Sequence, residues 1–353
     1  MRKEVLIDLT ALKNANTGLG HVAKSFADGF AALDDQDLAF NFLAPSSLSG
    51  AFGDRVKYIE HNAWQRAFPM LLPKVDLWHS TFQNYRLLRH SRNTRQIVTV
   101  HDLNFLYEKN PQKAKRYLRN LQQKIDKAAA VVAISQFVAE DIKKNIHLKN
   151  KPLKVIYNSV FRLDDQANQQ PQFIKDTKKP FFFTIGQILV KKNFHVLLDV
   201  MKQFQDTDLY ICGKCEEGDY GRFIANRIAS ENIKNVFLVG AINEQEKIWM
   251  YRHCQAFLFP SKFEGFGLPV VEAMQFGKPV FSSAMTSLPE VAGGNAFMWD
   301  SFDATHMVDC IKHNLCDFNR DQQRIERIKA HAFSFNLARH SREYLQLYRE
   351  TLA

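Results

Sequence analysis

The stretch Ala256-Phe-Leu-Phe-Pro-Ser-Lys-Phe-Glu-Gly-Phe-Gly-Leu-Pro-Val-Val-Glu272 holds an apolar run, a glycine-rich turn and the start of a helix in immediate succession. The apolar run 256–259 has the length of a buried strand. Pro269 suits the first turn of a helix, where its missing N–H leaves no hydrogen bond unmade. A buried strand followed by a tight turn and a helix is half of a βαβ unit, which predicts an α/β fold.

The turn between this strand and helix suits a ligand that carries phosphate. Gly265 and Gly267 let the backbone adopt conformations closed to other residues and approach a ligand closely. A helix that begins at Pro269 directs free N–H groups and the positive end of its dipole toward the turn. Glu264 and Glu272 can accept hydrogen bonds from ribose or hexose hydroxyl groups. In the alternative interpretation, Glu272 only complements the dipole from the first helical turn and Glu264 is a solvated loop residue.

Strand-like and helix-like segments alternate in two series, separated by the polar stretch Asp164–Gln172. Strands that alternate with helices form parallel sheets. A chain of 353 residues is longer than one core usually serves, so we expect one domain for each series. The expected strands are 5–9, 38–43, 56–59, 75–79, 96–101, 130–134 and 154–157 in the first series, and 181–185, 209–212, 236–239, 256–259, 279–282 and 296–299 in the second.

The composition is that of a globular protein. Apolar residues make up 46% and charged residues 24% of the chain, which excludes the disordered and fibrous classes. The chain runs from Met1-Arg-Lys-Glu directly into an expected strand, with no export signal. No apolar run approaches the roughly 18 residues that span a membrane. We therefore expect a soluble, cytoplasmic protein.

The net charge of +10 lies in the N-terminal half, because residues 1–175 hold 26 Lys or Arg and 16 Asp or Glu, whereas residues 176–353 hold 21 of each. A basic half suggests contact with an anionic membrane surface, nucleic acid or an acidic acceptor. The alternative is a solvated helix face. The charges concentrate in Arg86, Arg89, Arg92 and Arg95, and in an expected helix that carries Lys113, Lys115, Arg116, Arg119, Lys124 and Lys127.

The sequence offers few metal ligands. An odd number of cysteines, five, without an export signal indicates reduced thiols. Cys212 and Cys215 have C-x-x-C spacing, but a zinc site needs a second pair of ligands. The Asp-x-Asp motifs at 35–37 and 206–208 precede their strands, so we expect turns there. No metal site is predicted.

Other expected strand ends carry residues suited to phosphate. Gly186 follows the strand 181–185, and Lys191 and Lys192 precede the expected helix 194–204. Lysines at the start of a helix are unfavourable to its dipole. A bound phosphate would remove that conflict, and the alternative is a solvated pair of charges.

The first series has its own candidates. Gly18 and Gly20 precede the expected helix 22–33 and predict a tight turn where backbone meets a phosphate. His101 ends the strand 96–101 and should point at a ligand, since open α/β sheets bind ligands at the carboxyl ends of their strands. The alternative for His101 is a hydrogen-bonded structural histidine.

Together these residues resemble the retaining nucleotide-sugar glycosyltransferases of family four. The resemblance extends over almost the full chain, through the Glu-x7-Glu element, the lysine at the earlier strand end and the segments 18–20, 100–102, 132–135, 155–158 and 287–291. It implies the GT-B fold, in which two Rossmann-like domains face each other across a cleft. Residues 1–165 would form the acceptor-side domain, 166–178 a linker and 179–335 the nucleotide-sugar domain, with a C-terminal helix at 336–353 crossing back to the N-terminal domain.

The resemblance also implies a role for each residue. Glu272 would hold the ribose hydroxyl groups, and Glu264 and His101 would be the catalytic residues beside the transferred sugar. The remaining donor-binding residues would be Gly18, Gly20, Gly186, Lys191, Lys192, Gly265, Phe266, Gly267 and Leu268. Many members carry Arg where this chain has Gln187, which leaves the diphosphate more dependent on Lys192.

The implied activity is metal-independent, retaining transfer of a hexose from a nucleoside diphosphate sugar to a glycan or lipid-linked acceptor in surface polysaccharide assembly. The segment Thr286–Glu290 resembles that of members that use GDP-mannose. No cofactor beyond the donor is expected, and the basic half suits peripheral contact with the inner face of the plasma membrane. Two alternatives stay open: a UDP-sugar epimerase of the same fold and a basic nucleic-acid-binding protein.

Overall fold

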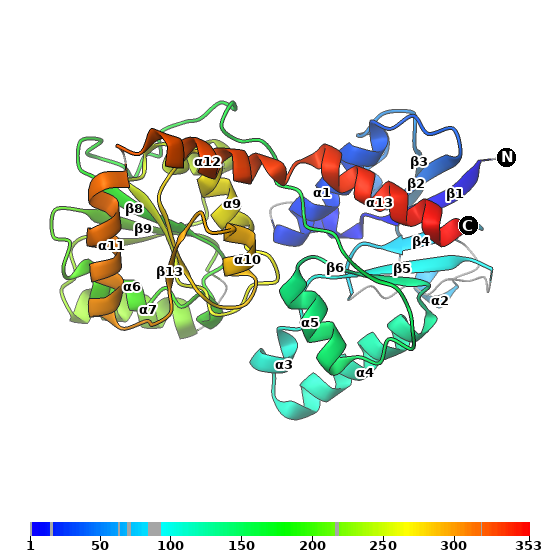
Figure 1. Ribbon diagram of the computed structural model, residues 1–353, viewed down its shortest axis with the longest axis horizontal. Helices are drawn as coiled ribbons and strands as arrows, with labels where there is room; N and C mark the ends of the chain where they lie inside the picture. Colours follow the sequence, from blue (N-terminus) through cyan, green and yellow to red (C-terminus); the bar gives the residue numbers. More distant parts are fainter. Residues whose placement is uncertain are drawn as a thin grey trace. The chain divides into compact units, whose positions relative to one another are not determined.

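The computed structural model describes residues 2–14, 17–62, 64–68, 72–83, 93–215, 219–318 and 320–353. The chain divides into two compact units, an N-terminal unit of Met1–Phe161 with Phe335–Ala353 and a C-terminal unit of Arg162–Ser334 (Figure 1). The polar stretch that we expected to be a linker lies on the C-terminal unit, because Arg252 donates to the Asp164 carbonyl at 2.7 Å. The boundary therefore comes before the expected linker at 166–178.

The N-terminal unit is built on a parallel sheet with the strand order β3-β2-β1-β4-β5-β6-β7. Every expected strand of the first series is present, with its ends shifted by no more than two residues. The strands are β1 (Lys3–Asp8), β2 (Leu38–Ala44), β3 (Lys57–Glu60), β4 (Leu77–Ser80), β5 (Arg95–Val100), β6 (Ala130–Ala133) and β7 (Leu153–Val155). The helices are α1 (Gly18–Ala31), α2 (Trp64–Ala67), α3 (Phe105–Glu108), α4 (Pro111–Lys127), α5 (Gln136–Asn145) and α13 (Leu337–Leu352).

The C-terminal helix α13 packs on the N-terminal unit beside α1, as the resemblance implied (Figure 1). Tyr344 and Tyr348 of α13 are buried in the same apolar core as Phe26 of α1. The Tyr348 hydroxyl lies 2.6 Å from His79 Nδ1, and the Tyr344 hydroxyl lies 3.1 Å from Thr99 Oγ1. These contacts tie α13 to the centre of the first sheet.

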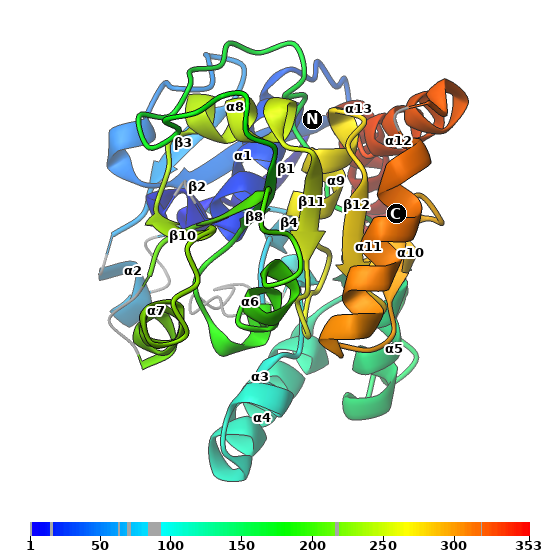
Figure 2. The same cartoon turned by 90° about the vertical axis from the view of Figure 1, so that its left-hand side faces the viewer.

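The C-terminal unit repeats this plan, with the parallel strand order β10-β9-β8-β11-β12-β13 (Figure 2). Its strands lie within one residue of the expected bounds, at β8 (Phe181–Ile185), β9 (Asp208–Cys212), β10 (Val236–Gly240), β11 (Ala256–Phe259), β12 (Val280–Ser283) and β13 (Phe297–Trp299). The helices are α6 (Val196–Met201), α7 (Asp219–Ser230), α8 (Glu244–His253), α9 (Leu268–Gln275), α10 (Leu288–Ala292), α11 (Ala304–Phe318) and α12 (Gln322–Ser334).

Helices cover both faces of the second sheet. Phe182 and Leu258 of the strands pack with Leu197 of α6 and Ile311 of α11 in one apolar core. Helix α9 contacts β11 and β12, and it also contacts α12. Both sheets have the order 3-2-1-4-5-6 that defines the Rossmann topology, with a seventh strand in the first. The predicted fold class of two Rossmann-like α/β domains is confirmed.

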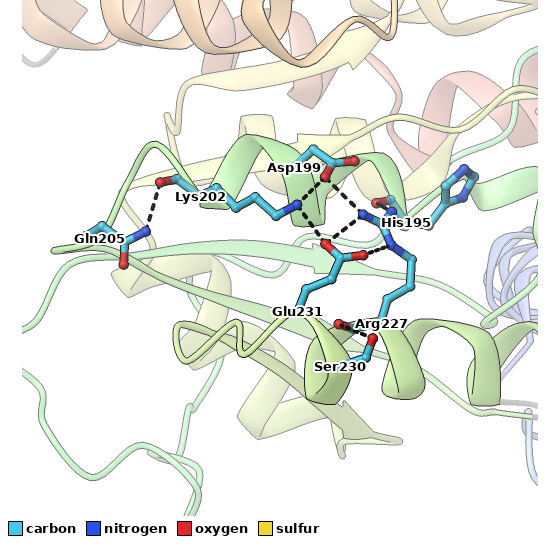
Figure 3. Close-up of polar contacts among 7 residues, drawn as sticks. All are labelled: His195, Asp199, Lys202, Gln205, Arg227, Ser230 and Glu231. Carbon is cyan, nitrogen blue, oxygen red and sulfur yellow. Dashed lines mark hydrogen bonds and ion pairs between the residues drawn. The ribbon is translucent and has the colours of Figure 1, made fainter.

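A network of opposite charges joins α6 to α7 (Figure 3). The Arg227 guanidinium donates to Asp199 Oδ1 at 2.9 Å and to Glu231 Oε1 at 2.5 Å. Lys202 contacts the same two carboxylates at 2.8 and 2.6 Å. Two cations and two carboxylates therefore alternate across this surface of the C-terminal unit.

Two helices begin at residues other than those we expected. Helix α1 begins at Gly18, four residues before the expected helix 22–33. Helix α6 begins at Val196 and not at 194, because the chain turns at Asn193, whose φ of 58° lies in the left-handed region. It ends at Met201, three residues before the expected end.

Several other sequence expectations can be compared with the structure. The five cysteines form no disulfide, in agreement with reduced thiols. One carboxylate of each Asp-x-Asp motif has a structural partner: Asp35 accepts from Arg349 at 2.6 Å, and Asp208 accepts from Lys179 at 2.5 Å. Among the described residues, no helix is both long and apolar enough to cross a membrane.

Candidate functional site

The switch point of the second sheet lies between β8 and β11, which are neighbours although distant in sequence. Open α/β sheets bind their ligands beyond the carboxyl ends of the two strands at such a point. The loop after β8 contains Gly186 and Lys192, and the loop after β11 contains Ser261 and Glu264. The sequence therefore places the candidate residues of this unit where the topology leaves a binding crevice.

Lys192 and Glu264 meet at this point. The Lys192 Nζ atom lies 2.5 Å from Glu264 Oε1, and the Ser261 hydroxyl donates to the same oxygen at 2.7 Å. The Lys192 and Glu264 side chains are 12% and 14% exposed. Lys192 Nζ also lies 5.0 Å from the centre of the Phe259 ring, within reach of a cation–π attraction. The site thus presents a fixed, largely desolvated ammonium group.

Two glycines let the loops around Lys192 approach closely. A Cβ atom on Gly186 would lie 3.3 Å from Lys192 Cε, and one on Gly213 would lie 1.8 Å from the Gly186 carbonyl oxygen. Gly213 has a φ of 144°, which also disfavours other residues. The loops after β8 and β9 therefore pack backbone against backbone beneath the lysine.

Lys191 and Lys192 differ in their surroundings, which the sequence did not distinguish. The Lys191 carbonyl accepts the Lys262 N–H at 2.7 Å. Ser261 Oγ lies 3.3 Å from the same carbonyl oxygen. These contacts hold the loop after β8 against the loop after β11. The Lys192 side chain instead pairs with Glu264. Gln187, in the place of the family's arginine, is exposed.

The turn before α9 has the predicted glycine conformation at Gly267 but not at Gly265, which does not have a positive φ. Gly267 has a φ of 101° and caps α9, and Pro269 lies in the first turn of that helix. A Cβ atom on Gly267 would lie 2.5 Å from Leu288 Cδ2. Glycine is therefore required at 267 on two grounds, its backbone conformation and the lack of space.

Two side chains from the loop after β12 fix this turn. Thr286 Oγ1 accepts the Glu264 N–H at 3.1 Å. The Ser287 hydroxyl donates to the Glu264 and Phe266 carbonyls at 2.9 and 3.1 Å. Thr286 has a φ of 57°, an unfavourable conformation for a β-branched residue that points to a functional constraint. The sequence did not indicate that Thr286 and Ser287 support the glycine turn.

Glu272 lies in the second turn of α9, not in the first as we expected, because the helix begins at Leu268. It therefore does not act as a simple dipole-complementing residue. Its carboxylate is buried, and Tyr251 donates to Oε2 at 2.9 Å while Lys247 Nζ lies 3.2 Å from Oε1. The sequence analysis missed Lys247 and Tyr251, although their spacing of four residues places them on one face of α8.

The glycines near the N-terminus do not form the predicted turn. Gly18 and Gly20 lie in the first turn of α1, and neither has a positive φ. Thr17 caps the helix, and its Oγ1 accepts the Gly20 N–H at 3.1 Å. The expected tight turn is wrong, because the threonine that precedes these glycines makes them the start of a helix.

His101 follows β5 in the N-terminal unit and is buried. Its Nε2 lies 2.8 Å from the Thr81 carbonyl, and its backbone N–H donates to Gln83 Oε1 at 3.0 Å. A carbonyl only accepts, so Nε2 carries the proton and Nδ1 keeps its lone pair. Burial lowers the pKa of His101 from 6.5 to about 4, so the ring is neutral near pH 7.

The candidate residues belong to two different units. His101, Gly18 and Gly20 lie in the N-terminal unit, whereas Gly186, Lys191, Lys192 and the segment 264–272 lie in the C-terminal unit. The structure brings Lys192, Glu264 and Ser261 together at the switch point of the second sheet. A shared cleft that also contains His101 stays a prediction.

Comparisons with known proteins find a family match within each of the two units. Residues 165–331 match the family described as Glycosyl transferases group 1, and residues 48–160 match Glycosyltransferase Family 4. The chain is 27% identical over 223 residues to the O-antigen chain mannosyltransferase RfbU of Salmonella typhimurium, a match that covers 62% of this chain and 60% of RfbU. It is 26% identical over 261 residues to the serotype-specific mannosyltransferase WbdA of Escherichia coli, a match that covers 68% of this chain and 31% of WbdA. The match thus spans less than two thirds of either relative.

Solved structures share the fold over the full chain. Sucrose-phosphate synthase from Thermosynechococcus elongatus superimposes with a TM-score of 0.78 and 17% identity, covering 99% of both chains. HepE of Anabaena, solved with UDP and glucose, superimposes with a TM-score of 0.73 and 16% identity, covering 99% of this chain and 100% of that one. These neighbours support the GT-B architecture. With both family matches taken together, the chain belongs to the group 1, family four glycosyltransferases.

Proposed function

We propose that this protein transfers a hexose, with retention and without a metal, from a nucleoside diphosphate sugar to a glycan or lipid-linked acceptor in surface polysaccharide assembly. The observation that carries the proposal is the convergence of Lys192 and Glu264 at the switch point of the second sheet. The names of RfbU and WbdA favour mannose as the sugar and an O-antigen-like glycan as the product. GDP-mannose is therefore the first donor to test.

In the proposed reaction, an acceptor hydroxyl oxygen attacks the anomeric carbon while the bond from that carbon to the diphosphate oxygen breaks. The acceptor proton passes to the departing diphosphate on the same face, so no side chain becomes glycosylated. Negative charge grows on the diphosphate, and the Lys192 ammonium and the N-terminal end of α9 would stabilise it. This electrostatic stabilisation is what would make a metal unnecessary.

Glu264, Glu272 and His101 have separate parts in this proposal. Glu272 would accept hydrogen bonds from the ribose hydroxyl groups, and Glu264 would orient the transferred sugar near Lys192. His101 offers a neutral Nδ1 with a lone pair, which suits a hydrogen bond from a sugar hydroxyl and not a positive charge.

A thermal-shift screen of GDP-mannose, UDP-glucose, GDP and UDP tests the donor, since a ligand that binds only the folded protein raises its melting temperature. Incubation of GDP-mannose with a lipid-linked glycan, followed by NMR of the new anomeric centre, tests transfer and retention. The same reaction after EDTA treatment tests metal independence. Release of an altered free sugar without acceptor would indicate an epimerase instead, and an absence of any sugar-nucleotide binding would refute the proposal.

We further propose that α4 brings the protein to an anionic membrane. Lys113, Lys115, Arg116, Arg119 and Lys127 are exposed on this helix, while Leu121 and Ile125 are buried. We expected Lys124 to add to this basic surface, but it donates to the Gln83 carbonyl at 2.6 Å. Arg86, Arg89 and Arg92 lie outside the described residues, and Arg95 donates to the Thr351 carbonyl at 2.7 Å.

Co-sedimentation with vesicles of phosphatidylcholine alone or with added phosphatidylglycerol tests this contact. We expect binding only to the anionic vesicles, weakened by salt and by Lys113→Glu with Arg116→Glu. Equal binding to both vesicles, or salt-dependent binding of duplex DNA in place of vesicles, would contradict it.

A further inference from the structure

Helix α8 directs a lysine and a tyrosine at the carboxylate of Glu272 on the neighbouring helix α9. Lys247 Nζ lies 3.2 Å from Glu272 Oε1, and the Tyr251 hydroxyl donates to Oε2 at 2.9 Å. Relative to full exposure, Lys247 is 8% exposed, Tyr251 0% and Glu272 9%. Each carboxylate oxygen therefore has its own donor from the same face of α8.

Lys247 also contacts a second carboxylate, because its Nζ lies 3.1 Å from Glu244 Oε1 one turn earlier in α8. Burial alone would lower the pKa of Lys247, but the Glu272 and Glu244 carboxylates raise it above its ordinary value. The lysine is therefore charged at neutral pH. Burial raises the pKa of Tyr251 well above its ordinary value, with the Glu272 carboxylate as a further cause, so the tyrosine hydroxyl keeps its proton and acts as a donor.

The buried charges of Lys247 and Glu272 are a poor source of folding stability. Removing two charges from water costs free energy that their attraction often fails to recover, and apolar residues of similar size frequently replace such pairs without loss of stability. What the arrangement does provide is one fixed orientation of the Glu272 carboxylate. A carboxylate oxygen accepts more than one hydrogen bond, so these donors leave capacity for a ligand.

We infer that Lys247 and Tyr251 are positioning residues, which hold the Glu272 carboxylate in the orientation that accepts hydrogen bonds from the 2′ and 3′ hydroxyl groups of a ribonucleoside diphosphate. The inference rests on the proposed function, in which Glu272 binds the ribose. It adds a consequence of its own: the discrimination between ribose and 2′-deoxyribose depends on two residues of α8 that act through Glu272.

The test compares binding of GDP with 2′-deoxy-GDP, and of UDP with 2′-deoxy-UDP, by titration calorimetry. The loss of one hydrogen bond to a charged group should weaken binding of the deoxy form about tenfold or more in the wild type. We expect Tyr251→Phe and Lys247→Met to weaken binding of the ribose form more than binding of the deoxy form, because the deoxy form has only its 3′ hydroxyl group in contact with Glu272. The ratio of the two affinities then falls toward one.

If Lys247 and Tyr251 only stabilise the fold, both variants should weaken binding of the ribose and deoxy forms equally, and the ratio of the two affinities should stay as in the wild type. Tyr210→Phe is the matched control, since it removes a buried tyrosine hydroxyl that donates to Asp208 at 3.4 Å in the same unit. Lys179→Met is the matched control for Lys247→Met, since Lys179 pairs with Asp208 at 2.5 Å. Both controls should keep the wild-type ratio. If Lys247→Met fails to fold, Tyr251→Phe alone decides the question.

The outcomes separate this inference from the proposed function. If the wild type binds none of the four nucleotides, the proposed function itself fails. If the wild type binds the ribose and deoxy forms equally, Glu272 has no ribose role and the inference is refuted. If the wild type discriminates and both α8 variants discriminate equally well, the positioning role is refuted while the proposed function stands.

Discussion

Lys192 and Glu264 form an ion pair across the switch point of the second sheet, 72 positions apart in sequence and 2.5 Å apart between Nζ and Oε1. In the free protein, the Glu264 carboxylate therefore occupies the position of an anionic partner to the lysine. A nucleoside diphosphate would bring a second anion to the same ammonium group. Donor binding and the position of Glu264 should thus depend on each other, which leads to two predictions.

Replacing Lys192 by methionine should weaken binding of GDP or UDP by about tenfold to a hundredfold. The reason is the loss of a charge-assisted hydrogen bond to phosphate from a largely desolvated group. Titration calorimetry measures the change. Lys234→Met is a suitable control, since Lys234 is exposed and precedes β10. An unchanged affinity in Lys192→Met would rule out the diphosphate contact.

Glu264→Gln should lower kcat about tenfold or more while the affinity for the nucleoside diphosphate stays the same or rises. The amide is neutral, so it no longer competes with phosphate for Lys192, but it leaves no negative charge beside the transferred sugar. Steady-state kinetics and calorimetry on the same preparation separate the two effects. Near-normal kcat in the variant would argue against any role for Glu264 in the reaction.

The strands could be predicted from the sequence, but the contacts between helices could not. Buried parallel strands are continuous apolar runs, so segments such as Phe181–Ile185 and Ala256–Phe259 could be located to the residue. The start of α1 lies four residues before the predicted one, because Gly18 and Gly20 favour a turn whereas Thr17 caps a helix with its side chain.

Lys247 and Tyr251 could not have been found by the same reasoning. The buried residues of helix α8 form one continuous run, Lys247–Tyr251, so no periodicity marks the face that meets Glu272. The pairing depends on the packing of α8 against α9, which joins residues 21 and 25 positions apart in sequence. Only the charge of a buried lysine could have signalled that a carboxylate must lie nearby.

Gly267→Ala should lower the free energy of unfolding by about 2–4 kcal/mol. The new Cβ atom would face both the strained φ of 101° and Leu288 Cδ2 at 2.5 Å. Gly50→Ala separates the two causes, since Gly50 has a φ of 79° with no atom within 4 Å of the added Cβ. Urea denaturation should show a cost of only about 1 kcal/mol for Gly50→Ala. Equal costs for both variants would mean that Leu288 yields without strain.

Arg227→Met should lower the free energy of unfolding by about 1 kcal/mol, because the guanidinium joins α7 to Asp199 of α6 (Figure 3). The value is modest since the Asp199 side chain is 40% exposed and solvent screens the attraction. The difference between variant and wild type should shrink as the salt concentration rises toward about 1 M. Denaturation curves at low and high salt measure this, and a difference that does not depend on salt would show that the guanidinium acts through packing.

Three buried histidines of the N-terminal unit should make the protein less stable in mild acid. Burial lowers the pKa of His340 from 6.5 to about 3, that of His101 to about 4, and that of His79 well below 6.5. The unfolded chain gains protons below pH 6.5 while the folded protein does not, so stability decreases as the pH falls from 6.5 toward 4, by about 1.4 kcal/mol per pH unit for each histidine.

Asp8 has the opposite effect on stability, because burial raises its pKa to about 7 and the folded protein then binds its proton more readily than the unfolded chain. It is one group, whereas the histidines are three. His340→Leu removes one histidine, and its Nδ1 has no hydrogen bond to lose. Between pH 6.5 and 5, the variant should therefore lose about 2 kcal/mol less stability than the wild type. Urea denaturation at the two pH values measures this difference. Parallel losses in both proteins would show that His340 gains its proton in the folded state as readily as in the unfolded chain.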